Sequence, residues 1–105
     1  MKYRTWKCGI CGESVIEGQR FIFVKDLGFV HLECAIERLL GKESVSRDII
    51  ALLDANEVIT YSIVRFKDSE IKASSKETKD LLINMRRELE KISAQLSSKL
   101  LEFLK

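Results

Sequence analysis

Two close pairs of metal-binding residue types constrain this chain more than any other feature of its sequence. Cys8 and Cys11 are separated by two residues, and after 19 intervening residues His31 and Cys34 are again separated by two. This pattern uses all three cysteines and the one histidine of the 105 residues. Because two pairs of thiolate and imidazole ligands on tight turns suit tetrahedral Zn²⁺, the sequence predicts one structural zinc ion per chain.

The residues around these pairs support a metal site. Gly9 and Gly12 permit the tight turn in which backbone N–H groups point at a thiolate sulfur. His31 precedes a predicted helix, and Cys34 lies in its first turn, where the helix dipole favours a thiolate. A segment of about 40 residues rarely builds a sufficient apolar core. Structural zinc contributes roughly 10–16 kcal/mol of apparent binding energy, which is ample to fold such a segment.

Three other interpretations of the same residues stay open at this point. A redox dithiol would need only Cys8 and Cys11, but no βαβ pattern surrounds them and the second pair is left unexplained. A catalytic zinc ion would use Glu33 as the acid of an H-x-E sequence, yet four protein ligands leave no open coordination position. The four residues would also be compatible with an unliganded core. Structural zinc, with no catalytic residue and no enzymatic activity, explains the pattern best.

A change in composition divides the chain near residue 42. All five glycines lie in the first 41 residues, and no glycine or proline follows them. Residues 1–42 show short apolar runs and turns, then a helix from about residue 32 with Gly41 as its C-terminal cap. We therefore expect a small zinc-stabilised α+β finger, with a short hairpin and a helix, followed by a long antiparallel helical hairpin in residues 43–105.

Two long helices are expected in this second part, at about residues 47–73 and 77–105. Ser46 is well placed to cap the first helix. Ser74 and Glu77 have the spacing of a capping box for the second helix.

The first long helix is apolar on nearly all sides. One stripe consists of Ile49, Leu52, Leu53, Ile59, Ile63 and Phe66, and a second consists of Ile50, Val58, Tyr61 and Val64. Such a helix is normally buried on several sides, so the second stripe is a candidate interface for a homodimer or another protein partner. The alternative is that the finger itself covers this stripe and the protein is a monomer. Residues 57–66 are rich in β-branched side chains and would also suit a strand, but no turn signal interrupts the helical pattern. Asn56 lies in the apolar seam, where it would set helix register or oligomeric state, or else face solvent.

The second long helix carries a seam with heptad-like spacing. Its members are Leu82, Met85, Leu89, Ile92, Leu96 and Phe103, with Leu100 and Leu104 beside them. A helix of about 28 residues is roughly 42 Å long and extends far beyond a finger of this size. The preceding helix is therefore its expected partner.

Charge and hydropathy exclude several classes of protein. The formal net charge is only +2, and acidic and basic residues are mixed along the chain. We therefore do not expect the strongly positive surface of a non-specific nucleic-acid binder. The sequence has no visible signal peptide and no apolar run near 20 residues. We therefore expect a cytoplasmic protein that makes no membrane contact. No small-molecule substrate is evident.

Nucleic-acid binding, as in a transcriptional regulator, is the alternative function. The cations Arg4, Lys7, Arg20 and Lys25 could contact phosphate while Trp6 stacks on a base. Against this, acidic residues share the same segment, and a centre with three thiolates and one histidine carries about one negative charge. The favoured function is a non-enzymatic zinc-binding scaffold that associates through its helices.

Residues 6–41 resemble a treble-clef or LIM-type zinc module. The resemblance rests on the knuckle with Cys8 and Cys11, a hairpin, and then His31 and Cys34 leading into a helix. A complete LIM domain would continue directly into a second finger, which this sequence lacks. The whole chain resembles a family of short archaeal proteins of unknown function that join such a finger to a helical tail. The resemblance implies a zinc module and carries no activity with it.

Overall fold

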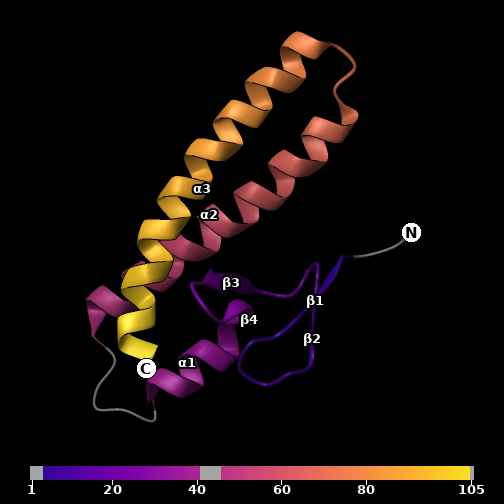
Figure 1. The fold of residues 1–105 in the computed structure, drawn as a ribbon. Helices are drawn as coiled ribbons and strands as arrows, with labels where there is room; N and C mark the ends of the chain where they lie inside the picture. Colours follow the sequence, from indigo (N-terminus) through magenta and orange to yellow (C-terminus); the bar gives the residue numbers. More distant parts are fainter. Residues whose placement is uncertain (1–3, 41–45, 105) are drawn as a thin grey trace.

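The computed structural model describes residues 4–40 and 46–104, which form a small head and a long helical hairpin (Figure 1). The head contains the strands β1 (Thr5–Lys7), β2 (Ser14–Ile16), β3 (Phe21–Val24) and β4 (Gly28–His31), and helix α1 (Leu32–Leu40). Helices α2 (Arg47–Lys72) and α3 (Lys76–Leu104) pack side by side, and their far ends extend well beyond the head. The fold is therefore the expected finger followed by a helical hairpin.

Two antiparallel hairpins build the head. In the first, Trp6 of β1 lies opposite Val15 of β2, and in the second, Phe23 of β3 lies opposite Phe29 of β4. The turn that joins β3 to β4 holds Asp26 and Gly28 at φ of 69° and 80°, which explains why the sequence around them reads as a turn. Strand β1 has no counterpart among the elements expected from the sequence.

Serine side chains cap both long helices. Ser46 Oγ accepts a hydrogen bond of 3.2 Å from the N–H of Ile49, as the sequence predicts. Helix α3 begins at Lys76, one residue earlier than expected. Its cap is Ser75 and not Ser74, because Ser75 Oγ accepts a hydrogen bond of 3.1 Å from the N–H of Thr78. The β-branched segment 57–66 is helical, so the helical prediction is confirmed there. The expected Gly41 cap, the boundary at residues 42 and 43, and residue 105 lie outside the described residues.

One apolar core joins the head to the long helices. It contains residues from β2, β3, β4 and all three helices, namely Cys8, Val15, Phe21, Ile22, Val24, Val30, Leu32, Ala35, Leu39, Ile49, Leu53, Val64 and Leu100. Helix α2 therefore packs along β3, the strand of the second hairpin that lies nearest to it. Val64 is only 4% exposed, because the head covers that side of α2. This member of the second stripe is therefore part of the core and is not available to a partner.

Asn56 forms the polar joint between α2 and the head. Its side chain is 1% exposed. The Asn56 amide donates to the carbonyl oxygen of Phe23 at 2.9 Å and accepts from the Phe23 N–H at 3.2 Å. Thr60 Oγ1 donates to the same Asn56 oxygen at 2.8 Å. The Asn56 amide thus satisfies the outer edge of β3 as a neighbouring strand would, and it does not face solvent.

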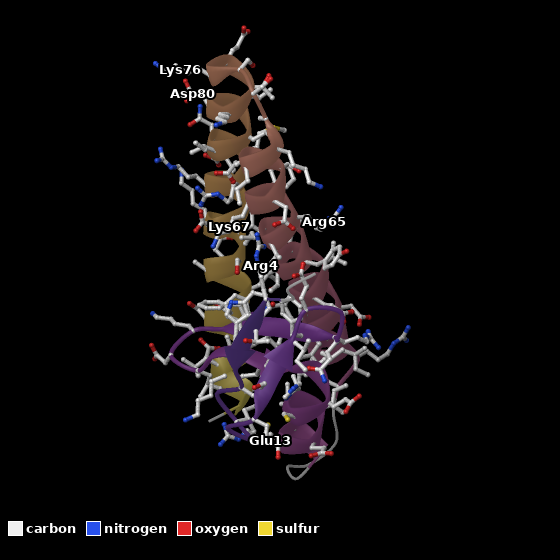
Figure 2. The ribbon with its side chains drawn as sticks, turned by 90° about the vertical axis from the view of Figure 1, so that its right-hand side faces the viewer. Arg4, Glu13, Arg65, Lys67, Lys76 and Asp80 are labelled. Atoms are coloured by element: carbon white, nitrogen blue, oxygen red, sulfur yellow. The ribbon has the colours of Figure 1, made fainter. Side chains whose placement is uncertain are left out.

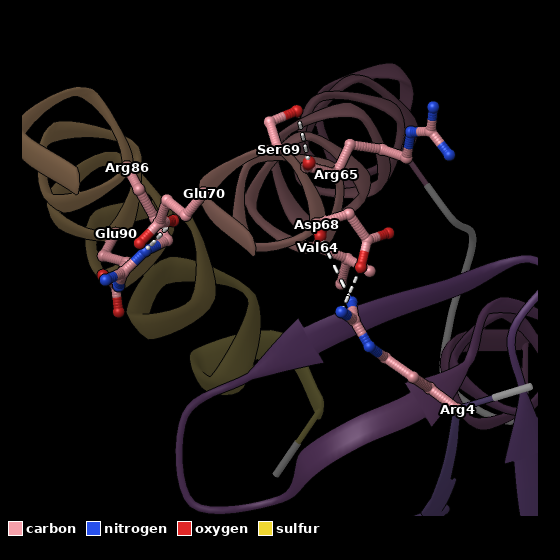
Figure 3. A network of polar contacts seen from close by, with 8 residues as sticks. All are labelled: Arg4, Val64, Arg65, Asp68, Ser69, Glu70, Arg86 and Glu90. Atoms are coloured by element: carbon pink, nitrogen blue, oxygen red, sulfur yellow. Dashed lines mark hydrogen bonds and ion pairs between the residues drawn. The ribbon is translucent and has the colours of Figure 1, made fainter. Parts of the chain in front are cut away.

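Arginines of the head add two further links to α2. Arg4 pairs with Asp68 and donates to the Val64 carbonyl oxygen at 3.2 Å (Figure 3). Arg20 forms a two-pronged pair with Glu57, with N···O distances of 2.7 and 2.8 Å. These pairs are partly exposed, so solvent screens them, and they add little to stability and mainly fix the orientation of the head.

The apolar seam of α3 is only partly covered. Leu100 is fully buried, and the small residues Ser93 and Ser97 are buried with it. Met85 and Ile92, which were expected to face α2, are 47% and 44% exposed. The expectation that the whole seam packs on α2 is therefore wrong for these two residues, because the most buried side of α2 is occupied by the head.

We expect the substitution Asn56→Leu to lower the free energy of unfolding by about 2–4 kcal/mol. Leucine has a similar size but leaves the Phe23 carbonyl buried without its partner and removes a partner of the Phe23 N–H. Urea denaturation followed by circular dichroism measures the change. Asn84→Leu, at an exposed position of α3, is the matched control and should change stability by less than about 0.5 kcal/mol. Equal effects of the two substitutions would contradict the role of Asn56.

Candidate metal centre

The four predicted ligands come together in the head. Cys8 follows β1, Cys11 lies in the next turn, His31 ends β4 and Cys34 lies in the first turn of α1. One ligand atom from each residue falls within 4.8 Å of all the others. Cys8 is buried, His31 and Cys34 are half-buried, and Cys11 is exposed. The arrangement can therefore hold one metal ion near the surface, with one ligand rooted in the core.

The distances between ligand atoms match a tetrahedral centre. His31 Nδ1 lies 3.5 Å from Cys11 Sγ and 3.6 Å from Cys34 Sγ. Tetrahedral Zn²⁺ with metal–sulfur bonds of about 2.3 Å and a metal–nitrogen bond of about 2.0 Å separates its sulfur and nitrogen ligands by about 3.5 Å. The sulfur and nitrogen atoms are therefore already spaced as a small tetrahedral cation requires.

The second ring nitrogen of His31 identifies which nitrogen is free for the metal. His31 Nε2 lies 3.0 Å from the carbonyl oxygen of Ser14. A carbonyl oxygen only accepts, so this contact places the ring proton on Nε2 and leaves the lone pair of Nδ1 facing the sulfurs. Such a hydrogen bond behind a ligand fixes both its tautomer and its orientation. No pattern in the sequence indicates this contact, because it depends on the position of the Ser14 backbone.

Backbone N–H groups surround the Cys8 sulfur. The N–H groups of Ile10, Cys11 and His31 approach Cys8 Sγ at 3.4, 3.5 and 3.5 Å. Burial by itself raises the pKa of the Cys8 thiol, but the N–H groups of Cys11, His31 and Ile10 outweigh burial and lower this pKa to about 6. Cys8 is thus prepared as a thiolate, the form that binds a metal ion.

Cys34 has the opposite environment. Burial, a hydrogen bond with the Cys11 side chain and the negative charge of Cys8 raise the pKa of the Cys34 thiol to about 12. Because the sulfurs lie close together, a negative charge on one of them makes deprotonation of the next thiol less favourable. A bound cation supplies the missing positive charge, so the chemistry of this ligand set fits a divalent metal.

Gly9 brings the knuckle against the second hairpin. Its N–H donates to the Phe29 carbonyl oxygen at 3.0 Å. A Cβ atom at residue 9 would lie 2.0 Å from the carbonyl oxygen of Leu27. The backbone at residue 9 therefore passes too close to the backbone at Leu27 for residue 9 to carry any side chain. Gly12 is required for a different reason, because it adopts φ of +79°, while the nearest atom to a Cβ there would be Lys7 Cε at an ordinary contact distance of 3.9 Å.

The residues proposed for nucleic-acid contact do not form one free surface. Arg4 and Arg20 are paired with carboxylates of α2. Trp6 stacks on Phe29 with ring centroids 4.5 Å apart. Lys7 and Lys25 are exposed.

The stripe proposed as a helical interface is also divided. Ile50, Val58 and Tyr61 are 49%, 62% and 53% exposed, whereas Val64 lies in the core. Glu33, the acid of the H-x-E sequence, is exposed on α1.

Comparison with known proteins places the chain in a family. A family model described as an uncharacterized protein conserved in archaea (DUF2175) matches residues 4–102. The chain belongs to this archaeal family. No curated protein and no solved structure gave a significant match. Among the described residues of this family member, no helix combines the length and the apolar character that a membrane span needs.

Replacing Cys8 by serine should abolish stoichiometric metal binding and unfold the head. Serine is a poor ligand for a soft site, and the lost metal energy is roughly 10–16 kcal/mol in small zinc modules. Elemental analysis of the purified protein and near-ultraviolet circular dichroism measure the two effects. Glu33→Gln, next to Cys34, serves as the control and should retain one metal ion per chain. Retention of the metal and fold by the Cys8→Ser protein would contradict this centre.

Two glycine substitutions should have different effects on the metal centre. Gly9→Ala would bring a methyl group closer to the Leu27 carbonyl oxygen than two atoms can approach. The substitution should therefore displace the knuckle and cause loss of the metal. Gly12→Ala should cost only about 1–2 kcal/mol, the penalty of a left-handed alanine, and should keep the metal. Metal content and thermal unfolding distinguish the two variants. The prediction fails if Gly12→Ala is the more damaging change.

Proposed function

We propose that the protein is a non-enzymatic, zinc-stabilised scaffold whose helical hairpin associates with a second copy of the chain. Three thiolates and one imidazole nitrogen form a ligand set typical of structural zinc. Four protein ligands leave no coordination position for a substrate, which supports a structural metal and argues against catalysis. The buried Cys8 also belongs to the apolar core, so the metal would stabilise the same core that holds α2.

The observation that carries the second half of the proposal is an exposed apolar face on α3. Leu81, Met85 and Ile92 are 58%, 47% and 44% exposed. With about 100° per residue, Ile92 lies about 160° around α3 from Glu90 and Ala94. Because Glu90 and Ala94 line a cleft beside the head, this face points away from the head. We call Leu81, Met85 and Ile92 the outer face of α3.

A second copy of the same helix suits this face. Leu82, Leu89 and Leu96 are half-buried beside it and, with Met85 and Ile92, repeat every three and four residues. That repeat is the pattern by which helices pack in coiled coils and four-helix bundles. The charges at its edge are balanced, because Lys91 pairs with Glu88 and Lys99 pairs with Glu102. A two-fold interface would therefore bring no block of like charges together.

The experiment is native mass spectrometry of the protein purified without added metal, supported by sedimentation equilibrium. We expect a dimer that contains two zinc ions. Ile92→Glu should yield a monomer that keeps one zinc ion, with a dissociation constant at least about 100-fold weaker, because the interface would bury an unpaired carboxylate. Tyr61→Glu, a similar change on the exposed side of α2, is the matched control and should remain dimeric.

Each other result has a distinct meaning. Dissociation by Tyr61→Glu but not by Ile92→Glu would place the interface on the α2 stripe that contains Ile50, Val58 and Tyr61. A monomeric wild-type protein with one zinc ion would overturn self-association and leave the metal assignment intact. A metal other than zinc, or no metal, would overturn the first half of the proposal.

A further inference from the structure

An apolar groove lies between α1 and the first turns of α2. Its floor consists of three leucines that are each 3% exposed, Leu32, Leu39 and Leu53. Ile36 of α1 and Ile50 of α2 also line it, and they are 37% and 49% exposed. The groove has a volume of about 300 Å³, which is the lower limit of the usual range for small-molecule sites. It is therefore better suited to a few apolar side chains of a partner.

An exposed apolar stripe on α2 continues from this groove. Val58 and Tyr61 are 62% and 53% exposed. With about 100° per residue, Tyr61 lies about 20° and Val58 about 80° around α2 from Ile50, so all three share one side of the helix. Ile50 and Tyr61 are roughly 16 Å apart along the helix axis, which is three helical turns. We call Ile36, Ile50, Val58 and Tyr61 the docking face.

Carboxylates outnumber cations around the groove. Asp54 lines the groove and is exposed. Arg20, which also lines it, is paired with Glu57 at 2.7 Å. The carboxylates of Glu57, Asp54 and Glu33 all raise the pKa of the Arg20 guanidinium, Glu57 most strongly, so the three lie around it. One cation among three carboxylates leaves an excess of negative charge at this end of the docking face.

The other charged residues on these two helices preserve the excess. Glu37 follows Ile36 on α1 and is exposed. Arg38 lies about 200° around α1 from Ile36, on the opposite side of that helix. Arg47, in the first turn of α2, lies about 60° around the helix from Ile50 and offsets one of the negative charges.

The far end of the docking face carries a positive charge. Arg65, one turn beyond Tyr61, is exposed and projects from the side of α2 at mid-length of the hairpin (Figure 2). The docking face therefore has carboxylates at the groove and one arginine at its other end. A bound segment would place its basic residues over the groove.

This distribution of charge distinguishes between possible partners. Nucleic acids and anionic lipid surfaces are negatively charged, so the carboxylates at the groove would repel them. A second copy of the chain that bound through this same face could offer only Arg65 to the carboxylates. A segment of another protein that is rich in lysine or arginine would complement them.

From these observations we propose that the docking face binds a basic amphipathic helix of another protein. Apolar side chains spaced three and four residues apart on that helix would enter the groove and cover Val58 and Tyr61. Its lysine or arginine side chains would meet the carboxylates of Asp54 and Glu33. This site goes beyond the proposed self-association and does not rest on it, because the outer face of α3 belongs to a different helix.

Two matched peptides test the proposal on the zinc-loaded full chain. The basic probe is the amphipathic peptide KLAKLAKKLAKLAK, and the acidic probe is ELAELAEELAELAE, which keeps every apolar side chain. Fluorescence anisotropy of the labelled peptides measures binding. We expect one basic peptide per chain, bound at least about tenfold more tightly than the acidic peptide. Because the whole chain has a net charge of +2, general electrostatic attraction would favour the acidic peptide instead.

Substitutions then locate the site. Ile50→Lys should weaken binding of the basic peptide at least about tenfold, because it puts a positive charge beside the groove. Ile71→Lys is the matched control, the same change at the far end of α2 where the side chain is 77% exposed, and should leave binding unchanged. Asp54→Asn should weaken binding about threefold to tenfold, and less in high salt. Circular dichroism checks that each variant is folded.

A further variant separates this proposal from self-association. Ile92→Glu alters the outer face of α3 and should bind the basic peptide as tightly as the wild-type protein does. A failed dimer prediction with intact peptide binding would therefore leave the docking face standing. Loss of peptide binding in the folded Ile92→Glu protein would place the peptide on α3 and overturn the proposal.

The remaining outcomes would also overturn it. Absence of binding by the basic peptide, or equal affinities for the two peptides, would refute the proposed partner. Equal binding by the wild-type and Ile50→Lys proteins would show that the peptide binds elsewhere. Dissociation of a dimer by Ile50→Lys in sedimentation equilibrium would assign the face to a second copy. Binding to vesicles of anionic phospholipid that Tyr61→Glu abolishes would assign it to a membrane surface.

Discussion

Three backbone N–H groups converge on the sulfur of Cys8, and the fold of the head depends on that convergence. Two of the donors belong to the knuckle and the third is His31 at the end of β4, so one atom connects both halves of the ligand set. The same sulfur lies at the edge of the apolar core. A metal ion bound at Cys8 would therefore hold the two hairpins together and support the surface on which α2 rests.

Attachment of α2 to this surface uses polar groups inside an apolar contact. Asn56 and Thr60 satisfy the outer edge of β3 at Phe23. These directional bonds allow one register between helix and strand, whereas apolar contacts alone would tolerate small shifts. Arg4 and Arg20 add pairs on either side of the joint. The cleft beside Trp6 exists because the head is held in this register, with its aromatic rings facing the hairpin.

Helix α2 packs against both the head and α3, and as a result part of α3 is left uncovered. The head covers the side of α2 that contains Ile49, Leu53 and Val64, while α3 packs on a neighbouring side. A single helix offers too little remaining surface to cover the wide apolar face of α3. Met85 and Ile92 consequently stay exposed. The proposed dimer would cover them without disturbing the head, which leaves the cleft open on the opposite side of α3.

The sequence by itself determined the features that depend on neighbouring residues. The two-residue spacing within each ligand pair specifies a tight turn with two ligands, so the four metal ligands were predictable. The apolar periodicity and Ser46 likewise determined the two long helices, including the β-branched segment 57–66. Strand β1 was missed because three residues carry too little pattern, and the cap of α3 was misplaced by one residue because two serines stand side by side.

Only the tertiary structure decided which surfaces meet. Val64 and Tyr61 belong to the same stripe in the sequence, but the head covers one and leaves the other exposed. From the sequence, Asn56 was equally suited to a helix seam or to solvent. In the structure, it lies against the unpaired edge of β3. The Leu27 carbonyl that excludes a side chain at Gly9, and the Ser14 carbonyl that orients His31, are also distant in sequence. Contacts of this kind depend on how whole elements pack, and a local pattern of residues carries no information about that packing.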